Sequence, residues 1–200
     1  MIIRSVEYAG SVATPDGPRP GTLPQIAFSG RSNVGKSSLI NSVLQRTRSK
    51  VARVSGKPGK TRMLNYYRVN DCFFLVDLPG YGYAKVPGVM RDAWRELIEG
   101  YLTGDKELRG VVHLVDSRHD PTRADTEMVD FLANLGLPTL VVLTKMDKLT
   151  RSARTRHVAN ALEKLGLEED QLLPFSSKTG EGREELLVAL SDILGLEGDS

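Results

Sequence analysis

Eight consecutive residues, Gly30 to Ser37, follow the pattern G-x-x-x-x-G-K-[ST]. In this pattern backbone N–H groups, a lysine and a hydroxyl converge on phosphate. Lys36 is spaced to reach the outer phosphates, and the Ser37 hydroxyl is spaced to ligate magnesium. The pattern therefore predicts binding and cleavage of a nucleoside triphosphate. The alternative is a glycine-rich turn that happens to carry a lysine.

The segments on either side decide between these interpretations. Residues 25–29 form a short apolar run after Pro24, and residues 36–45 carry Leu39, Ile40 and Val43 at helical spacing. A turn between a strand and a helix N-terminus directs several N–H groups at one anion. This context favours a phosphate loop.

A second segment, Asp77-Leu78-Pro79-Gly80, closes the apolar run 72–76. A carboxylate at the end of a strand beside the phosphate loop can hold magnesium through water, and the Gly80 N–H can meet the terminal phosphate. By itself D-x-P-G is also a good turn. Its spacing after the phosphate loop favours the functional interpretation.

Two further segments concern the base. In Thr144-Lys145-Met146-Asp147, Asp147 can accept hydrogen bonds from the ring N–H and exocyclic amine of guanine, whereas adenine presents the wrong donors. Lys145 can lay its methylene stem along the base. Residues 175–182, FSSKTGEG, can offer a backbone N–H to the guanine carbonyl. Alone, the first is equally a charged helix start and the second only a loop.

In this order the segments resemble those of translation-factor-related GTPases of the Era-like branch, over residues 30–182. Five segments are similar to the EngB family of bacterial ribosome-assembly GTPases: GRSNVGKSSLIN, KPGKTRMLNYY, DLPGYGYAKV, TKMDK and FSSKTGEG. The resemblance implies slow GTP hydrolysis with magnesium and a role in maturing the large ribosomal subunit, with effects on cell division and septation. Thr144 departs from the general GTPase pattern, which has asparagine there, and this weakens one supporting hydrogen bond.

Two segments are expected to respond to the nucleotide. Thr61 is the candidate second magnesium ligand, because a hydroxyl in that loop can order only when the terminal phosphate is present. Residues 79–86 form the second switch, in which Tyr81 and Tyr83 supply contact area. The alternative for the tyrosines is core packing.

Tyr81 stands where many GTPases have a glutamine that positions water, so slow intrinsic hydrolysis is expected. A partner or a cation must then assist. Asn33 matches the residue that helps ligate potassium in potassium-dependent relatives. Stabilising the loop turn is an equally good role for Asn33.

The predicted catalytic residues are Lys36, Thr61, Gly80 and Asn33. The predicted metal ligands are Ser37, Thr61 and, through water, Asp77. The residues predicted to bind GTP or GDP are Gly30, Arg31, Ser32, Asn33, Val34, Gly35, Lys36, Ser37, Gly59, Lys60, Thr61, Arg62, Met63, Asp77, Leu78, Pro79, Gly80, Thr144, Lys145, Met146, Asp147, Phe175, Ser176, Ser177 and Lys178.

The chain order predicts an α/β fold, a P-loop GTPase domain over residues 25–195 with a six-stranded, mostly parallel sheet and helices on both faces. Residues 1–24 are expected to be an extended segment and loop, and residues 196–200 a short acidic tail. The predicted strands are 25–29, 64–70, 72–77, 110–116, 138–144 and 171–175, with one antiparallel hairpin turned at Asn70-Asp71. The predicted helices are 36–45, 88–103, 122–135, 151–166 and 181–194.

The composition fits a small cytoplasmic enzyme. A chain of 200 residues with 40% hydrophobic and 26% charged residues suffices for one core. The single cysteine, Cys72, excludes a disulfide framework and is expected to be a buried thiol in a strand. No secretory signal or run long enough to span a bilayer is visible.

Charge is unevenly distributed: residues 1–62 carry a balance of +9 and residues 163–200 one of −7, although the formal net charge is +2. This asymmetry indicates an oriented encounter with a polyanion. The cations concentrate between Arg46 and Arg62, which is either an RNA-backbone contact or a solvated loop that offsets triphosphate charge. We expect ribosomal RNA of the large subunit as the partner, no DNA, and a monomer.

Three function classes compete. The favoured one is a GTP hydrolase that assists assembly of the large ribosomal subunit. The second is a GTP-gated interaction protein of the cell-division machinery without a direct ribosomal role. The third, a P-loop kinase, gives T-K-M-D and S-S-K no function.

Overall fold

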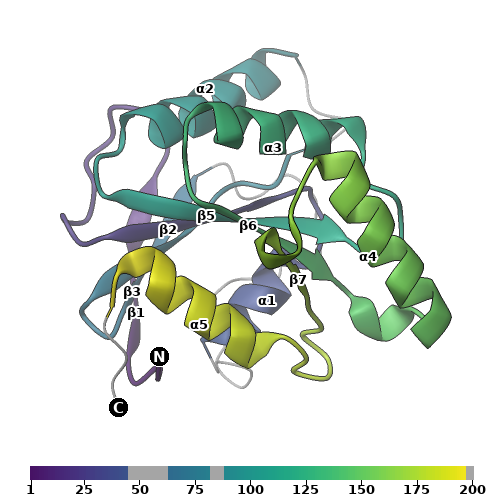
Figure 1. The fold of residues 1–200 in the computed structure, drawn as a ribbon. Coiled ribbons are helices and arrows are strands. Elements are labelled where there is room, and N and C mark those ends of the chain that lie inside the picture. Colours follow the sequence, from purple (N-terminus) through teal and green to yellow (C-terminus); the bar gives the residue numbers. More distant parts are fainter. Residues whose placement is uncertain (45–62, 82–87, 197–200) are drawn as a thin grey trace.

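The computed structural model describes residues 1–44, 63–81 and 88–196. Within these ranges the chain forms seven strands in one sheet (Figure 1). The strands are β1 (Val6–Val12), β2 (Gln25–Gly30), β3 (Leu64–Val69), β4 (Phe73–Asp77), β5 (Leu108–Asp116), β6 (Thr139–Thr144) and β7 (Leu172–Pro174). Their order across the sheet is β1-β3-β4-β2-β5-β6-β7. Pairing is antiparallel between β1, β3 and β4 and parallel from β4 to β7.

Helices cover both faces of the sheet. They are α1 (Lys36–Val43), α2 (Gly88–Gly104), α3 (Arg123–Asn134), α4 (Arg151–Leu165) and α5 (Arg183–Leu194), with short 3-10 turns η1 (Met146–Lys148) and η2 (Glu169–Gln171). Helices α1 and α5 pack on one face and α2 and α3 on the other, with α4 beside α3 (Figure 1).

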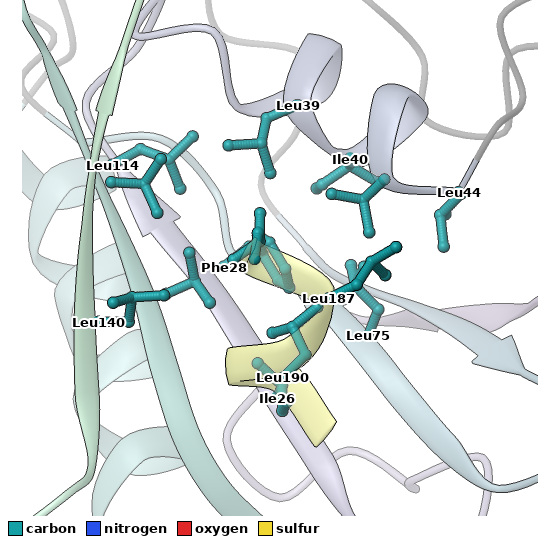
Figure 2. Packing of buried hydrophobic residues seen from close by; sticks show 14 of the residues in the cluster. Ile26, Phe28, Leu39, Ile40, Leu44, Leu75, Leu114, Leu140, Leu187 and Leu190 are labelled. Carbon is teal, nitrogen blue, oxygen red and sulfur yellow. The ribbon is translucent and has the colours of Figure 1, made fainter. Parts of the chain in front are cut away.

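The core follows from strands that are buried on both faces. In β2, Ile26 and Phe28 pack among leucines and isoleucines of α1 and α5 (Figure 2). Ala27, between them, packs in the cluster that α2 and α3 complete. All six residues of β2 are buried, as expected for a central parallel strand. Burial on both faces holds the carboxyl end of this strand, and the loop after it, in a fixed place.

The predicted α/β class, the five helices and the six strands are confirmed, but the total of six strands is wrong. Part of the predicted N-terminal extended segment is β1, which pairs antiparallel with β3, so the sheet has two antiparallel pairs. β1 is a half-exposed edge strand with a register shift between Tyr8 and Gly10. A bulged edge strand interrupts the period-2 alternation that identifies strands in a sequence.

The hairpin turn predicted at Asn70-Asp71 is confirmed: both residues take the left-handed conformation, with φ of 51° and 56°, as two-residue hairpin turns require. The expectation for Cys72 is wrong. It closes the turn, where its N–H donates to Val69 O at 2.9 Å, and it is exposed. The thiol therefore lies at the hairpin tip, because β4 begins only at Phe73.

Candidate functional site

The phosphate loop joins the end of β2 to the start of α1, as its sequence predicted. Gly30 has a φ of 155°, and a Cβ there would lie 3.0 Å from Leu114 O and from Val34 Cγ1, so only glycine fits. Gly35 caps α1 with a φ of 110°. The first turn of α1 carries no acidic residue. Its free N–H groups and positive dipole end are available to a phosphate.

Lys36, the first residue of α1, makes an ion pair with Asp77 at the end of β4. The parallel register that sets Phe28 beside Asp77 brings this carboxylate next to the phosphate loop. Asp77 is buried, with 6% of its surface exposed. The structure therefore gathers a lysine, a carboxylate and the neighbouring Ser37 at one helix N-terminus. A hydroxyl and a carboxylate are hard oxygen donors, which fit magnesium.

The segment after Asp77 runs along the phosphate loop. Leu78 N donates to Phe28 O at 3.0 Å, Tyr81 N to Gly30 O at 3.3 Å, and Ser32 N to Tyr81 O at 2.9 Å. Ser32 Oγ donates to Gly80 O at 3.2 Å. A Cβ on Gly80 would lie 3.2 Å from Ser32 Cα. Gly80 is thus packed against the phosphate loop.

The T-K-M-D segment holds the other side of the phosphate loop. Lys145, with a φ of 63°, donates from Nζ to Asn33 O and to Asp116 Oδ2, both at 2.7 Å. Thr144 Oγ1 lies 2.6 Å from Val34 O and 3.2 Å from Val115 O. One hydroxyl hydrogen serves one acceptor fully, whereas an asparagine amide could donate to both. Thr144 therefore still bonds to the phosphate loop, but it makes one hydrogen bond fewer than an asparagine could.

Asp147 meets the loop after β7. Its Oδ1 accepts from Ser176 Oγ at 2.8 Å, and Ser176 Oγ in turn accepts from the N–H groups of Lys178 and Thr179 at 3.3 Å. Among the described residues nothing donates a hydrogen bond to the buried Oδ2; Lys148 Nζ lies 3.5 Å away without hydrogen-bond geometry. Burial would raise the pKa of Asp147, but the Ser176 hydrogen bond and the Lys148 charge hold it below its ordinary value.

The buried Oδ2 of Asp147 is ion-paired with Lys148 but has no hydrogen-bond donor among the described residues, and a buried acceptor of this kind is normally hydrogen-bonded. The N–H pair on the edge of guanine supplies such donors, and the edge of adenine does not. The structure thus brings together the predicted residues of the phosphate loop, the D-x-P-G segment, T-K-M-D and the loop after β7. Met63 precedes β3 and is exposed. Gly59, Lys60, Thr61, Arg62 and Tyr83 lie outside the described residues.

Asn33 takes a left-handed conformation, with a φ of 65°. This agrees with its expected role in the turn, and its side chain is exposed. A cavity of about 200 Å³ lies on the side of the phosphate loop that faces the residues after β5. It is lined by Arg31, Ser32, Asn33, Val34, Val115, Asp116, Arg118, His119, Asp120 and Asp125.

Sequence reasoning missed Asp116, which ends β5. Burial would raise the pKa of Asp116, but hydrogen bonds from Arg118 and Lys145 lower it to about 2. The carboxylate thereby fixes the Lys145 ammonium over the phosphate loop. Its position at the carboxyl end of a strand, like that of Asp77, was the signal available in the sequence.

The sequence also did not predict that the Tyr81 side chain lies against two buried polar residues, His113 and Asp125. The side chain packs inward, which agrees with the core-packing alternative for the tyrosines. The Tyr81 hydroxyl donates to Asp125 Oδ1 at 2.8 Å and lies 3.1 Å from His113 Nε2. His113 comes from β5 and is fully buried. Burial lowers its pKa to about 4, and the nearby Asp125 carboxylate opposes this only in part.

His113 makes stability depend on pH. As pH falls below 6.5, the unfolded chain takes up a proton that the folded chain accepts only near pH 4, so the free energy of unfolding should fall by about 3 kcal/mol over that interval. Urea unfolding from pH 7.5 to 4 measures this. His113→Gln should flatten the slope, whereas His119→Gln, at an exposed position, should not. An unchanged slope in His113→Gln would contradict the assignment.

Among the described residues, no three histidine, cysteine, aspartate or glutamate side chains gather into a metal-binding group. The predicted magnesium ligands are of a different kind, because they are hydroxyl groups and water molecules as well as one carboxylate. No helix in the described part of the chain is long and apolar enough to cross a membrane.

Comparison with known proteins gives consistent results. Residues 25–145 match the model of the family described as 50S ribosome-binding GTPase, and residues 97–195 match that of the elongation factor Tu GTP binding domain. A probable GTP-binding protein EngB of Gemmatimonas aurantiaca is 52% identical over 98% of this chain and 96% of its own length. Its counterpart in Desulforamulus reducens is 46% identical over 99% of this chain and 97% of its own length.

Solved structures agree. A crystal structure of a probable GTP-binding protein engB superposes with a TM-score of 0.72 at 26% identity, covering 86% of this chain and all of the other. The structure of Era in complex with MgGDPNP and a segment of 16S ribosomal RNA has a TM-score of 0.68 at 26% identity. It covers 90% of this chain and 59% of the other. Both alignments extend over most of the sheet and helices described above.

Proposed function

Because this chain belongs to the EngB family of GTP-binding proteins and is a GTP hydrolase, we propose that it acts as a nucleotide-dependent switch in assembly of the large ribosomal subunit. Guanine recognition by Asp147 is the premise of the switch. The observation that carries this premise is the buried Oδ2 of Asp147, which lacks a hydrogen-bond donor among the described residues. Cell division and septation would be affected as a consequence.

The chain's own residues divide the work. The α1 N-terminus and Lys36 bind the phosphates, and the Gly80 N–H meets the terminal one. Ser37 and, through water, Asp77 would hold magnesium, which would supply positive charge to offset that of the phosphates. Thr61 joins these ligands only in the triphosphate state, so that its loop reports which nucleotide is present. Asp147 and the backbone of the loop 175–178 select guanine.

Hydrolysis at this site is proposed to be slow. The residue after Gly80 is Tyr81, whose hydroxyl is already engaged by Asp125 and His113. It cannot orient a water as a glutamine amide does. Potassium held by Asn33, or a group from a partner, would supply the missing stabilisation.

The large ribosomal subunit is proposed as the partner on two grounds. The matching family model is described as a 50S ribosome-binding GTPase, and the N-terminal third of the chain carries the excess of positive charge. The basic residues between Arg46 and Arg62 lie outside the described residues, in the segment that contains Thr61. A polyanion contact in that segment would depend on the nucleotide.

We expect the protein to co-sediment with large ribosomal subunits in the presence of a non-hydrolysable GTP analogue and to dissociate steeply as salt rises, because counterions are released from RNA phosphates. Replacing Arg48, Lys50 and Arg53 together by glutamine should lower the logarithmic salt slope by roughly two to three. Replacing Arg151, Arg156 and Lys164 of α4 removes the same charge elsewhere and serves as the control. An unchanged slope would place the contact on another face, and binding indifferent to nucleotide would favour a client outside the ribosome, such as the division machinery.

A further inference from the structure

The side chain of Tyr81 contacts two elements that are distant from it in the sequence, β5 and α3. Its hydroxyl donates to Asp125 Oδ1 of α3 at 2.8 Å and lies 3.1 Å from His113 Nε2 of β5. The Tyr81 and His113 rings stack, with centroids 6.0 Å apart and planes 9° apart. This group of three residues is called the Tyr81 anchor below.

The direction of the hydrogen bonds can be deduced. The Tyr81 hydroxyl has one hydrogen, and it goes to the carboxylate, which only accepts. Toward His113 the phenol oxygen must therefore accept, so Nε2 carries the imidazole proton. The lowered pKa of His113 keeps the ring neutral near pH 7, which agrees with one protonated nitrogen. The Tyr81 anchor is thus an ordered chain, His113 to Tyr81 to Asp125.

Asp125 is fixed from its other side. Its Oδ2 accepts from Thr122 N at 2.9 Å and from Thr122 Oγ1 at 2.7 Å, which forms the capping box of α3. Asp125 is 3% exposed. The cap uses one carboxylate oxygen, and the second oxygen is directed to Tyr81. A residue that served the cap alone would need no buried second acceptor.

The backbone of Tyr81 is held as firmly as its side chain. Tyr81 N and O both bond to the phosphate loop, at Gly30 O and Ser32 N, and the preceding carbonyl, that of Gly80, accepts from Ser32 Oγ. Gly80 therefore stands between Asp77, at the end of β4, and a residue tied to the loop, to β5 and to α3. Its peptide has little freedom left to lose.

We propose that Asp125 is a positioning residue for the Gly80 peptide: by holding the Tyr81 hydroxyl, it keeps that peptide ordered beside the phosphate loop for a terminal phosphate. This rests on the proposed role of the Gly80 N–H. A segment that is already ordered pays less conformational entropy when it meets its ligand. GDP has no terminal phosphate, so its affinity does not depend on this order. The Tyr81 anchor should therefore raise the affinity for GTP relative to that for GDP.

Tyr81→Phe tests the proposal, because it removes the hydroxyl and keeps the ring that stacks on His113. Tyr66→Phe is the matched control: Tyr66 is fully buried, and no described residue makes a hydrogen bond with its hydroxyl. The readout is the ratio of the affinity for a fluorescent non-hydrolysable GTP analogue to the affinity for fluorescent GDP. Tyr81→Phe should bind the analogue about three- to tenfold more weakly, as the loss of one hydrogen bond to a buried carboxylate implies, with GDP affinity within twofold of wild type. Tyr66→Phe should change neither.

Two further variants separate positioning from helix capping. Thr122→Ala removes the hydroxyl from the cap but keeps the Thr122 N–H bond to Asp125 Oδ2. It should therefore lower the melting temperature without changing the affinity ratio. In Asp125→Ala the ratio should shift as in Tyr81→Phe. The double variant should shift it no further, because both substitutions break the same hydrogen bond, the one between the Tyr81 hydroxyl and Asp125 Oδ1. Independent, additive shifts would overturn the proposal.

The remaining outcomes are also decisive. An unchanged ratio in Tyr81→Phe, or equal loss for both nucleotides, would show that the Tyr81 anchor only packs the core. A ratio shifted toward the triphosphate would show that it holds the opposite state. Gly80→Ala, whose Cβ would lie 3.1 Å from Ser32 Oγ, separates the role of Gly80 from that of Asp125. If Gly80→Ala leaves the ratio unchanged, the proposed role of Gly80 fails. If Gly80→Ala lowers the ratio but Tyr81→Phe and Asp125→Ala do not, only the role of Asp125 fails.

Discussion

Asp147→Asn is expected to weaken GDP binding about a hundredfold or more and to create affinity for xanthosine diphosphate. Ser176 Oγ donates to Oδ1 at 2.8 Å, and this bond orients the substituted amide with its oxygen toward Ser176. The amide nitrogen then takes the place of the buried Oδ2, and an acceptor becomes a donor. The N–H groups of guanine lose two charge-assisted hydrogen bonds of about 1.5–3 kcal/mol each, whereas the carbonyl of xanthine gains a donor.

Titration of fluorescent GDP, XDP and ADP against the wild type and the variant measures this exchange. Asp120→Asn is the matched control, because Asp120 is an exposed carboxylate paired with Lys164 and Asn160 on α4. It should bind GDP like the wild type. Tight ADP binding by the wild type, or loss of GDP binding in Asp147→Asn without gain of XDP, would contradict the assignment.

Lys36→Ala is expected to weaken GTP and GDP together, by about a hundredfold, because one ammonium at the α1 N-terminus contacts outer phosphates that both nucleotides possess. Equal loss distinguishes this residue from Tyr81, whose substitution should spare GDP. The same fluorescence titration measures both affinities.

The Lys36 variant also leaves Asp77 without its ion-pair partner. Circular dichroism must therefore show a folded chain before a lost affinity is attributed to the site. Lys164→Ala, which removes a lysine paired with Asp120 on the surface of α4, is the control and should keep both affinities. Retention of GDP binding by Lys36→Ala would contradict the assigned role of the phosphate loop.

The sequence predicted the fold where its pattern was strong. The central strands are apolar throughout and the helices have regular spacing, so most predicted bounds lie within two residues of those observed. β1 was not recognised because its half-exposed edge depends on pairing with β3, a contact about 60 residues away. Cys72 was misplaced by one residue, which was enough to move its side chain from the core to the turn.

For the site, the sequence predicted residues that belong to local motifs and missed those that act across the fold. The contacts of Lys145 with Asn33 and of Thr144 with Val34 connect segments more than 100 residues apart. Asp125 has the spacing of a helix cap, and nothing local indicates that its second oxygen meets Tyr81. His113 lies within an apolar run, where a buried histidine has no sequence signature of its partner. Such pairs follow from strand order, which a sequence pattern constrains only loosely.

We propose that the nucleotide bound at this site controls association with the large ribosomal subunit. The most direct test is co-sedimentation of wild-type protein and Asp147→Asn with large subunits, using non-hydrolysable analogues of GTP and XTP. The wild type should bind only with the GTP analogue, and the variant should bind only with the XTP analogue. Binding of both proteins regardless of the nucleotide would contradict the proposal.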